Sequence, residues 1–198
     1  QVIPALAVGC PVIIRPATQT PMSAVKLVEL LKKAGLPDGW AQAVVCDRQG
    51  GELLVTSEKT AFFTFIGSGP VGWYLNSKSS PGTRSALEHG GVAPVIVEPD
   101  ANIDAMIPDL GKGGFYHAGQ VCVSVQRVYV HESIVDEVAS KLTDYASKLV
   151  VGDQLDPKTE VGPLINNDEV NRVEEWVNES VEKGGKILIG GKRISDSC

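Results

Sequence analysis

The sequence has few cysteines, a shortage of basic residues and no long apolar run. It contains four cysteines in 198 residues and no Cys-x-x-Cys pair, which disfavours both a zinc site and a disulfide framework. This usage is typical of a reducing compartment, so we expect a cytoplasmic protein without a metal site. Acidic residues outnumber basic ones by 24 to 18, and the net charge of −6 argues against a nucleic-acid binder, which needs a basic surface.

The most apolar stretch, residues 2–14, predicts neither a membrane span nor a signal peptide. Pro4 and Pro11 interrupt it, and no basic segment precedes it. It predicts instead the passage from a helix to a strand. The composition, 43% hydrophobic and 21% charged, is that of a globular protein and excludes a disordered chain, a collagen-like repeat and a polytopic membrane protein.

Strand and helix patterns alternate along the first half of the chain. Thr20 and Pro21 predict the cap and first residue of a helix that Gly35 ends. The apolar run 11–15 predicts a strand buried on both faces. Further strands are expected at 42–46, 61–66 and 84–88, and further helices at 51–57 and 71–77. This alternation with short connections predicts a parallel α/β sheet.

The second half begins after Gly90-Gly91, where we place a domain boundary, giving domains 1–90 and 91–198. Here Pro108 predicts a break or kink in a helix over 103–114. Ser133 is the expected cap of the next helix, and Gly184 the expected end of a helix over 169–183. Strands are expected at 93–98, 127–131 and 186–189, with a loop over 153–163.

The segment Gly67-Ser-Gly-Pro-Val-Gly72 matches the pattern Gly-x-Gly-x-x-Gly between a predicted strand and a predicted helix. Such glycines let the backbone approach a pyrophosphate at the positive end of a helix. The alternative is a tight strand-to-helix turn of the kind found in any α/β protein. The motif follows the third predicted strand, whereas the usual dinucleotide fingerprint follows the first.

Cys122 and Glu88 are the candidate reactive side chains. The Gly-Gln-Val sequence before Cys122 suits an exposed turn in which a thiolate can form, whereas Cys10 and Cys46 adjoin apolar runs and are expected to be buried. A structural thiol is the alternative for Cys122. Glu88 lies about 20 residues after the glycines, as a ribose ligand does in the simple dinucleotide fold. It can also be a general base beside a nucleophile, or a solvated carboxylate.

Several motifs follow one another along the chain. They are Arg15-Pro-Ala-Thr-Gln-Thr-Pro21, Phe65-Ile-Gly-Ser-Gly-Pro-Val-Gly72, Glu88-His-Gly-Gly91, Pro94-Val-Ile-Val-Glu-Pro-Asp-Ala-Asn102, Gly119-Gln-Val-Cys122, Asp153-Gln-Leu-Asp156 and Val161-Gly-Pro163. In this order they resemble the aldehyde dehydrogenase superfamily over essentially the whole chain. The separation of 122 − 88 = 34 residues between Glu88 and Cys122 is also that of the family.

The resemblance implies an α/β fold, in which a parallel Rossmann-like sheet of the cofactor domain is followed by part of a second α/β catalytic domain. It also implies covalent catalysis. Cys122 would attack the carbonyl of a small aldehyde, hydride would pass to the nicotinamide, and Glu88 would activate the water that releases a carboxylic acid. This role makes Glu88 the base and argues against the branch that acylates coenzyme A.

The resemblance also implies which residues bind NADP or NAD. They are Arg15, Thr18, Gly67, Ser68 and Gly72, with the glycine turn and its helix beneath the cofactor phosphates. The family's variant of the dinucleotide fold accounts for the late position of this turn. Arg15 stands where the family usually has Lys, and Thr18 where it usually has Glu. The loss of a carboxylate beside an arginine favours the extra phosphate of NADP.

The chain is expected to be the central piece of a longer enzyme. By resemblance, the asparagine of the oxyanion hole precedes Gln1 and the glutamate that holds the nicotinamide ribose follows Cys198, so the chain alone is expected to be inactive. His89, Val92 and Ile66 also differ from the usual family residues. The whole enzyme is expected to be a homo-oligomer that binds neither nucleic acid nor membranes. A non-catalytic nucleotide-binding module and a structural derivative of an enzyme are the alternatives.

Overall fold

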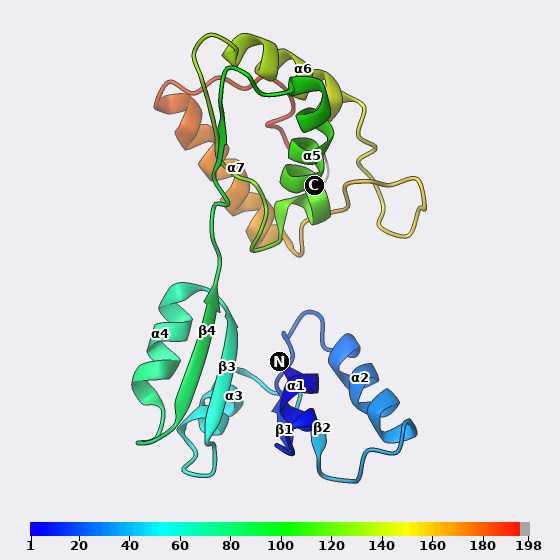
Figure 1. Cartoon of the computed structure of the whole chain (residues 1–198), viewed down its shortest axis with the longest axis vertical. Helices are drawn as coiled ribbons and strands as arrows, with labels where there is room; N and C mark the ends of the chain where they lie inside the picture. The colour runs from blue at the N-terminus through cyan, green and yellow to red at the C-terminus, as the bar shows by residue number, and fades with distance from the viewer. Residues whose placement is uncertain (195–198) are drawn as a thin grey trace. The chain divides into compact units, whose positions relative to one another are not determined.

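The structure, a computed structural model, describes residues 1–194 and divides the chain into two compact units, Gln1–His89 and Gly90–Cys198 (Figure 1). Each unit combines helices with parallel strands, as the sequence predicts. Within the described residues, no helix has both the length and the apolar character needed to cross a membrane.

The first unit holds two parallel strand pairs, β1 with β2 and β3 with β4. In chain order its elements are α1 (Val2–Ala7), β1 (Val12–Ile14), α2 (Met22–Lys33), β2 (Ala41–Ala43), α3 (Arg48–Thr56), β3 (Phe62–Gly67), α4 (Gly69–Lys78) and β4 (Arg84–His89). The predicted passage from a helix to a strand over residues 2–14 is confirmed as α1 and β1. The predicted strand and helix alternation is also confirmed.

Helices cover the strands of the first unit only in part. Helix α2 packs against β2, and α4 packs against β3 and β4. Ile13 of β1 is 55% exposed and Ile66 of β3 is 62% exposed, so the prediction of a strand buried on both faces at 11–15 is wrong. Among the described residues the strands form separate two-stranded sheets rather than one continuous sheet.

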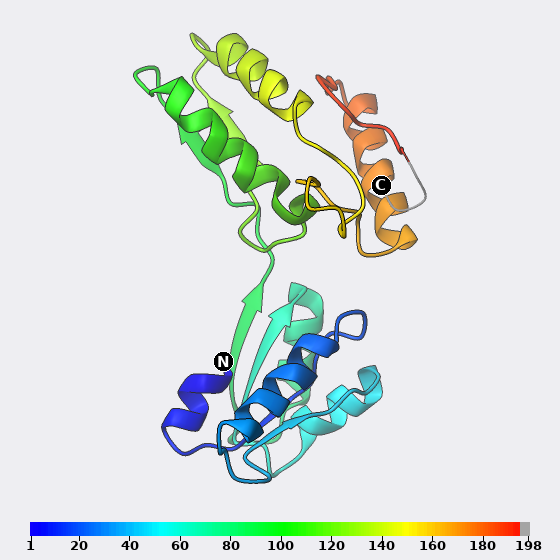
Figure 2. The same cartoon turned by 90° about the vertical axis from the view of Figure 1, so that its right-hand side faces the viewer.

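The second unit is built around the contact between two helices (Figure 2). Its elements are β5 (Val95–Val97), α5 (Ile103–Phe115), the short 3₁₀ turn η1 (Tyr116–Gly119), β6 (Val128–Val130), α6 (Val135–Ser147) and α7 (Asn167–Glu182), with β5 parallel to β6. Ile103 and Ile107 of α5 are buried against Val138 of α6. Partly buried side chains surround this core: Met106, Val130, Ile134, Leu142 and Tyr145.

An ion pair joins the same two helices at the surface. Lys141 Nζ of α6 lies 2.6 Å from Asp104 Oδ1 of α5 and 2.8 Å from Glu137 Oε1. The hydrogen bonds to these carboxylates raise the pKa of Lys141 above its ordinary value. Because the pair is exposed to solvent, it stabilises the helix contact far less than the apolar core does.

Two local predictions in the second unit are wrong, and a third is wrong in part. Helix α5 runs through Pro108 as one continuous helix, so the chain has no break there, and the alternative of a kink stays a prediction. Ser133 does not cap α6, because Ile134 occupies the N-cap position and the Ser133 hydroxyl lies 2.9 Å from His131 Nδ1. Residues 186–189 form no strand, since no other described strand pairs with them, and a strand needs a neighbour to bond its backbone groups.

Helix ends follow the sequence more closely than helix starts. Gly35 after α2 and Gly184 after α7 have φ values of 94° and 93°, the left-handed conformation that glycine adopts without strain. Pro21 is the N-cap of α2 rather than its first residue. Helix α3 begins earlier than predicted, because the Asp47 carboxylate accepts a hydrogen bond from the Gly50 N–H (2.8 Å).

Helix α4 approaches the ends of β3 and β4 closely at Gly72. A Cβ atom added at this buried glycine would lie 2.5 Å from His89 Cε1 and 3.1 Å from Phe65 Cδ1. At Gly69, one turn earlier on the same helix, the nearest atom would be His89 Cγ at 3.9 Å, an ordinary contact. Gly72 is therefore the position at which the helix requires a residue without a side chain.

We expect Gly72→Ala to lower the free energy of unfolding by about 1–3 kcal/mol, because the methyl group overpacks the helix–strand contact. Gly69→Ala is the matched control and should be neutral or stabilising, since alanine favours a helix over glycine by about 1 kcal/mol. Urea unfolding of the protein and both variants measures the difference. Equal stability of the two variants would contradict the close contact.

Candidate functional site

The glycine motif lies at a strand-to-helix turn, as predicted. Gly67 is the last residue of β3, Ser68 is the exposed N-cap of α4, and Gly69 begins the helix. The Ser68 side chain makes no capping hydrogen bond. The first N–H groups of a helix carry partial positive charge, so this turn presents the backbone that suits a phosphate group.

The parallel register of β3 and β4 brings Glu88 beside the glycine turn. Glu88 pairs with Ile66, and His89 pairs with Gly67. Both strands end at the same edge, so the exposed Glu88 carboxylate and the turn belong to one end of the sheet. The ring nitrogens of His89 are buried under this edge and have no hydrogen-bond partner among the described residues.

Arg15 and Thr18 come together at the end of the other strand pair. Arg15 follows β1, and its Nη2 donates to Thr18 Oγ1 (3.2 Å) and to the backbone oxygen of Cys46 (3.0 Å). Its Nε is buried and has no hydrogen-bond partner within the described part of the chain. A Cβ added at Gly51 of α3 would lie 3.6 Å from this Nε. Two hydrogen bonds thus hold the guanidinium in place, and its Nε–H group remains a hydrogen-bond donor without a described acceptor.

Cys122 belongs to the second unit and Glu88 to the first. The Cys122 side chain is exposed, as predicted, in the turn between η1 and β6. A hydrogen bond from the Ser124 N–H to the Val121 oxygen (3.0 Å) closes this turn. Ser124 is 1% exposed, and within the described residues its hydroxyl has no partner.

Sequence reasoning did not assign a role to Gln120, two residues before the thiol. Its side-chain amide bonds to backbone groups at both ends of a long stretch of chain, from His117 to Ile165. The available signal was its place in the Gly-Gln-Val-Cys motif. Nothing in that motif indicates a partner more than 40 residues away, where the structure places Pro163 and Ile165.

The other cysteines differ from the sequence prediction. Cys10 is exposed rather than buried, because it follows the end of α1 at the surface. Cys46 has intermediate exposure, and its sulfur packs against the first turn of α3, where a Cβ on Gly50 would lie 2.9 Å from Sγ. Cys198 lies outside the described residues.

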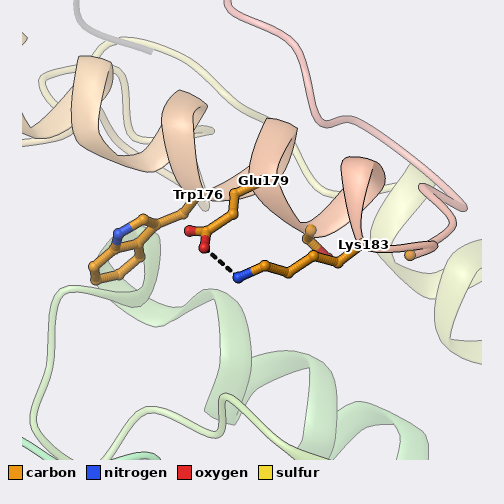
Figure 3. Close-up of a pocket in the computed structure, with 5 residues that line it drawn as sticks. Trp176, Glu179 and Lys183 are labelled. Atoms are coloured by element: carbon orange, nitrogen blue, oxygen red, sulfur yellow. Dashed lines mark hydrogen bonds and ion pairs between the residues drawn. The ribbon is translucent and has the colours of Figure 1, made fainter.

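A surface pocket on α7 does not contain the predicted site residues. It is lined by Trp176, Glu179, Ser180, Lys183 and Gly185. Figure 3 shows the Glu179 carboxylate and the Lys183 ammonium directed toward one another as an ion pair, with Trp176 one turn earlier on the same helix. The two charges neutralise each other across one turn, so the pocket offers no unpaired charge to a ligand.

Parallel strand pairs, a glycine turn at a strand-to-helix passage and an exposed thiol in a second unit define a Rossmann-like α/β protein. Comparison with known proteins specifies the class further. The chain matches the aldehyde dehydrogenase family over residues 1–198 and belongs to this family.

The most similar relatives include enzymes that act on small aldehydes. The chain is 45% identical over 192 residues to 3-sulfolactaldehyde dehydrogenase of Priestia megaterium, covering 96% of this chain and 40% of the relative. It is 39% identical over 200 residues to a probable NADP-dependent succinate-semialdehyde dehydrogenase of Sinorhizobium fredii, covering 100% of this chain and 41% of the relative. The chain therefore spans about two fifths of the length of these relatives.

Solved structures agree with the fold. Succinate-semialdehyde dehydrogenase from Burkholderia pseudomallei matches with a TM-score of 0.95 and 37% identity, covering 100% of this chain and 41% of that one. Glyceraldehyde-3-phosphate dehydrogenase GapN from Methanocaldococcus jannaschii, complexed with NADP, matches with a TM-score of 0.93 and 36% identity, covering 99% and 44%. The predicted α/β fold and the family resemblance are confirmed.

We expect iodoacetamide near neutral pH to alkylate Cys122 about tenfold or more faster than Cys46, because alkylation requires an accessible thiolate. Peptide mapping after timed labelling measures both rates in one sample. The exposed Cys10 supplies an internal reference for an accessible thiol, since its predicted protection is wrong. Equal labelling of Cys46 and Cys122 would contradict a reactive thiol at Cys122.

Proposed function

We propose that the full-length protein oxidises an aldehyde to a carboxylic acid with NAD(P), with Cys122 as nucleophile and Glu88 as general base. The observation that carries this proposal is the exposed Cys122 turn in a chain that matches the family from end to end. Residues 1–90 would form the C-terminal half of the NAD(P)-binding domain. Residues 91–198 would form the N-terminal half of the catalytic domain.

Cys122 would begin the reaction as a thiolate. Its Sγ bonds to the carbonyl carbon, and the carbonyl oxygen takes a proton to complete a thiohemiacetal. That oxygen then returns its proton to solvent and re-forms the carbon–oxygen double bond as hydride leaves the same carbon, which leaves a thioester on Sγ. The nicotinamide, when bound, supplies the hydride acceptor.

Glu88 would act in the second half of the reaction. Its carboxylate takes a proton from water, and the water oxygen bonds to the thioester carbon. The carbon–sulfur bond then breaks, which releases the acid and restores the Cys122 thiolate. Its exposure at the edge of β4 supports this role, because a general base must reach water.

The first unit has groups that would bind the phosphates and the adenosine part of a dinucleotide. The exposed turn of Gly67 and Ser68 at the start of α4 would hold phosphate, and Gly72 lets the helix pack close to the strand. Arg15, whose buried Nε has no described partner, and Thr18 would contact the adenosine ribose or its phosphate. This donor set fits NAD(P).

The donor set at Arg15 and Thr18 supports NADP at least as well as NAD. The pair carries a guanidinium and a hydroxyl, with no carboxylate to repel a phosphate. The absence of that repulsion outweighs the one neutral hydrogen bond that a ribose ligand would add, about 1 kcal/mol. The probable succinate-semialdehyde dehydrogenase of Sinorhizobium fredii is also named as an NADP enzyme.

The substrate is proposed to be a small aldehyde that carries an anionic group. The relatives named above act on 3-sulfolactaldehyde and succinate semialdehyde, which bear a sulfonate and a carboxylate. Succinate semialdehyde is therefore the aldehyde for the assays below.

The location and the oligomeric state of the full-length protein are also proposals. The cysteine usage supports a cytoplasmic setting, and the family resemblance supports a homo-oligomer.

Two substitutions separate the roles of the reactive residues in the full-length protein. Cys122→Ala should abolish oxidation of succinate semialdehyde, because no thioester can form. Glu88→Gln should leave a burst of one reduced nicotinamide per site but slow steady-state turnover by about 10²–10⁴-fold. Rapid-mixing absorbance measures both phases. Glu58→Gln, at another exposed carboxylate of the first unit, is the control and should behave like the unmodified protein. Unchanged turnover in Glu88→Gln would disprove its role as base.

Cofactor selectivity gives a second test. We expect kcat/KM with NADP to equal or exceed that with NAD, and Thr18→Glu to shift the ratio toward NAD by about tenfold, or 1.4 kcal/mol. Thr20→Glu adds the same charge two residues further on and should shift the ratio much less. A preference of the unmodified protein for NAD by more than about tenfold would overturn the assignment.

A further inference from the structure

The turn that leads to Cys122 has a backbone conformation that its residues disfavour. His117 has φ 49° and ψ 36°, and Ala118 has φ 55° and ψ 35°. Residues with a Cβ rarely adopt this left-handed region, and two in succession persist only where surrounding contacts hold them. One contact is local, because the Gln120 backbone N–H donates to the His117 oxygen (3.1 Å).

The Gln120 side chain adds further contacts, and these reach beyond the turn. Its Nε2 donates to the backbone oxygen of His117 (3.0 Å) and to that of Pro163 (3.3 Å). Its Oε1 accepts a hydrogen bond from the Ile165 N–H (2.9 Å). One amide thus bonds the strained turn on one side and a segment 43–45 residues away on the other.

That distant segment is itself fixed by α7. Ile165 directly precedes Asn166, the N-cap of α7, whose side chain accepts from the Glu169 N–H (2.9 Å). Val170, in the first turn of the helix, is 4% exposed and anchors it in the unit. The segment at 163–165 is therefore fixed in the unit, and the hydrogen bonds of Gln120 connect the turn at 116–119 to it.

We propose that Gln120 is a positioning residue for Cys122, and this inference rests on the proposed function. It holds the turn 116–119 against the start of α7 and so fixes where the thiol is presented. The role requires an amide, which donates to carbonyl groups and accepts from an N–H at once. A carboxylate of the same size keeps the bond from Ile165 but cannot donate to His117 or Pro163.

Hydrogen exchange tests the contact without any assay of activity. In the full-length protein, exchange at the Ile165 amide should become about fivefold faster in Gln120→Ala, because the bond that protects it is lost. Gln120→Glu should keep the protection. Unchanged exchange in Gln120→Ala would overturn the proposal, since the hydrogen bond between Ile165 and Gln120 would not exist in solution.

Steady-state kinetics test the role. Both Gln120→Ala and Gln120→Glu should lower kcat for succinate semialdehyde by about 10–100-fold, as expected when a reacting atom is displaced by about 1 Å. The KM for the cofactor should stay unchanged, because Gln120 lies in the other unit from the glycine turn. Gln126→Ala and Gln126→Glu are matched controls, at an exposed glutamine of the same unit whose side chain makes no hydrogen bond among the described residues.

The outcomes separate the two proposals. A variant that melts at a lower temperature but keeps its kcat assigns Gln120 a structural role only and overturns the inference. Loss of kcat in Gln126→Ala to the same extent also overturns it. If Cys122→Ala retains turnover, the proposed function itself fails. If Cys122→Ala is inactive while both Gln120 variants are fully active, only the positioning role fails.

Discussion

The close contact between α4 and the end of β4 is the constraint on which the first unit depends. Gly72 lies so close to His89 that the space between them has no room for a side chain on residue 72. This contact positions α4 against the strands, and the N-terminus of the helix lies next to the end of β3. The parallel register then places Glu88 beside the same turn. A single glycine therefore couples helix packing, the proposed phosphate-binding turn and the proposed base.

The second unit depends on a different kind of constraint. Apolar contacts between α5 and α6 form its core, but the turn that carries Cys122 lies outside that core and is exposed. Polar contacts hold this turn, through the Gln120 amide and the backbone bond between Ser124 and Val121. Hydrogen bonds have strict geometry, so they can fix the exposed thiol of the proposed nucleophile where packing alone would leave it free to move.

Arg15 shows how the two kinds of constraint combine. Its Nε is buried beside Gly51 of α3, while Nη2 donates to Thr18 and to the Cys46 carbonyl. The guanidinium is thus ordered by the protein before any ligand arrives. Pre-ordering of this kind reduces the entropy that binding must overcome, which suits the proposed contact with a cofactor phosphate.

The amino-acid sequence by itself determined features that depend on neighbouring residues. Gly35 and Gly184 end their helices through a local backbone conformation that glycine favours. The strand-to-helix turn at Gly67 follows from the local order of an apolar run and a glycine motif. The tertiary structure alone decided what depends on distant partners. Residues 186–189 form no strand because no described strand pairs with them, and Cys10 is exposed because no described element covers it. The hydrogen bond between Gln120 and Ile165 joins residues that are 45 positions apart in the sequence. No local sequence pattern predicts a contact across such a separation.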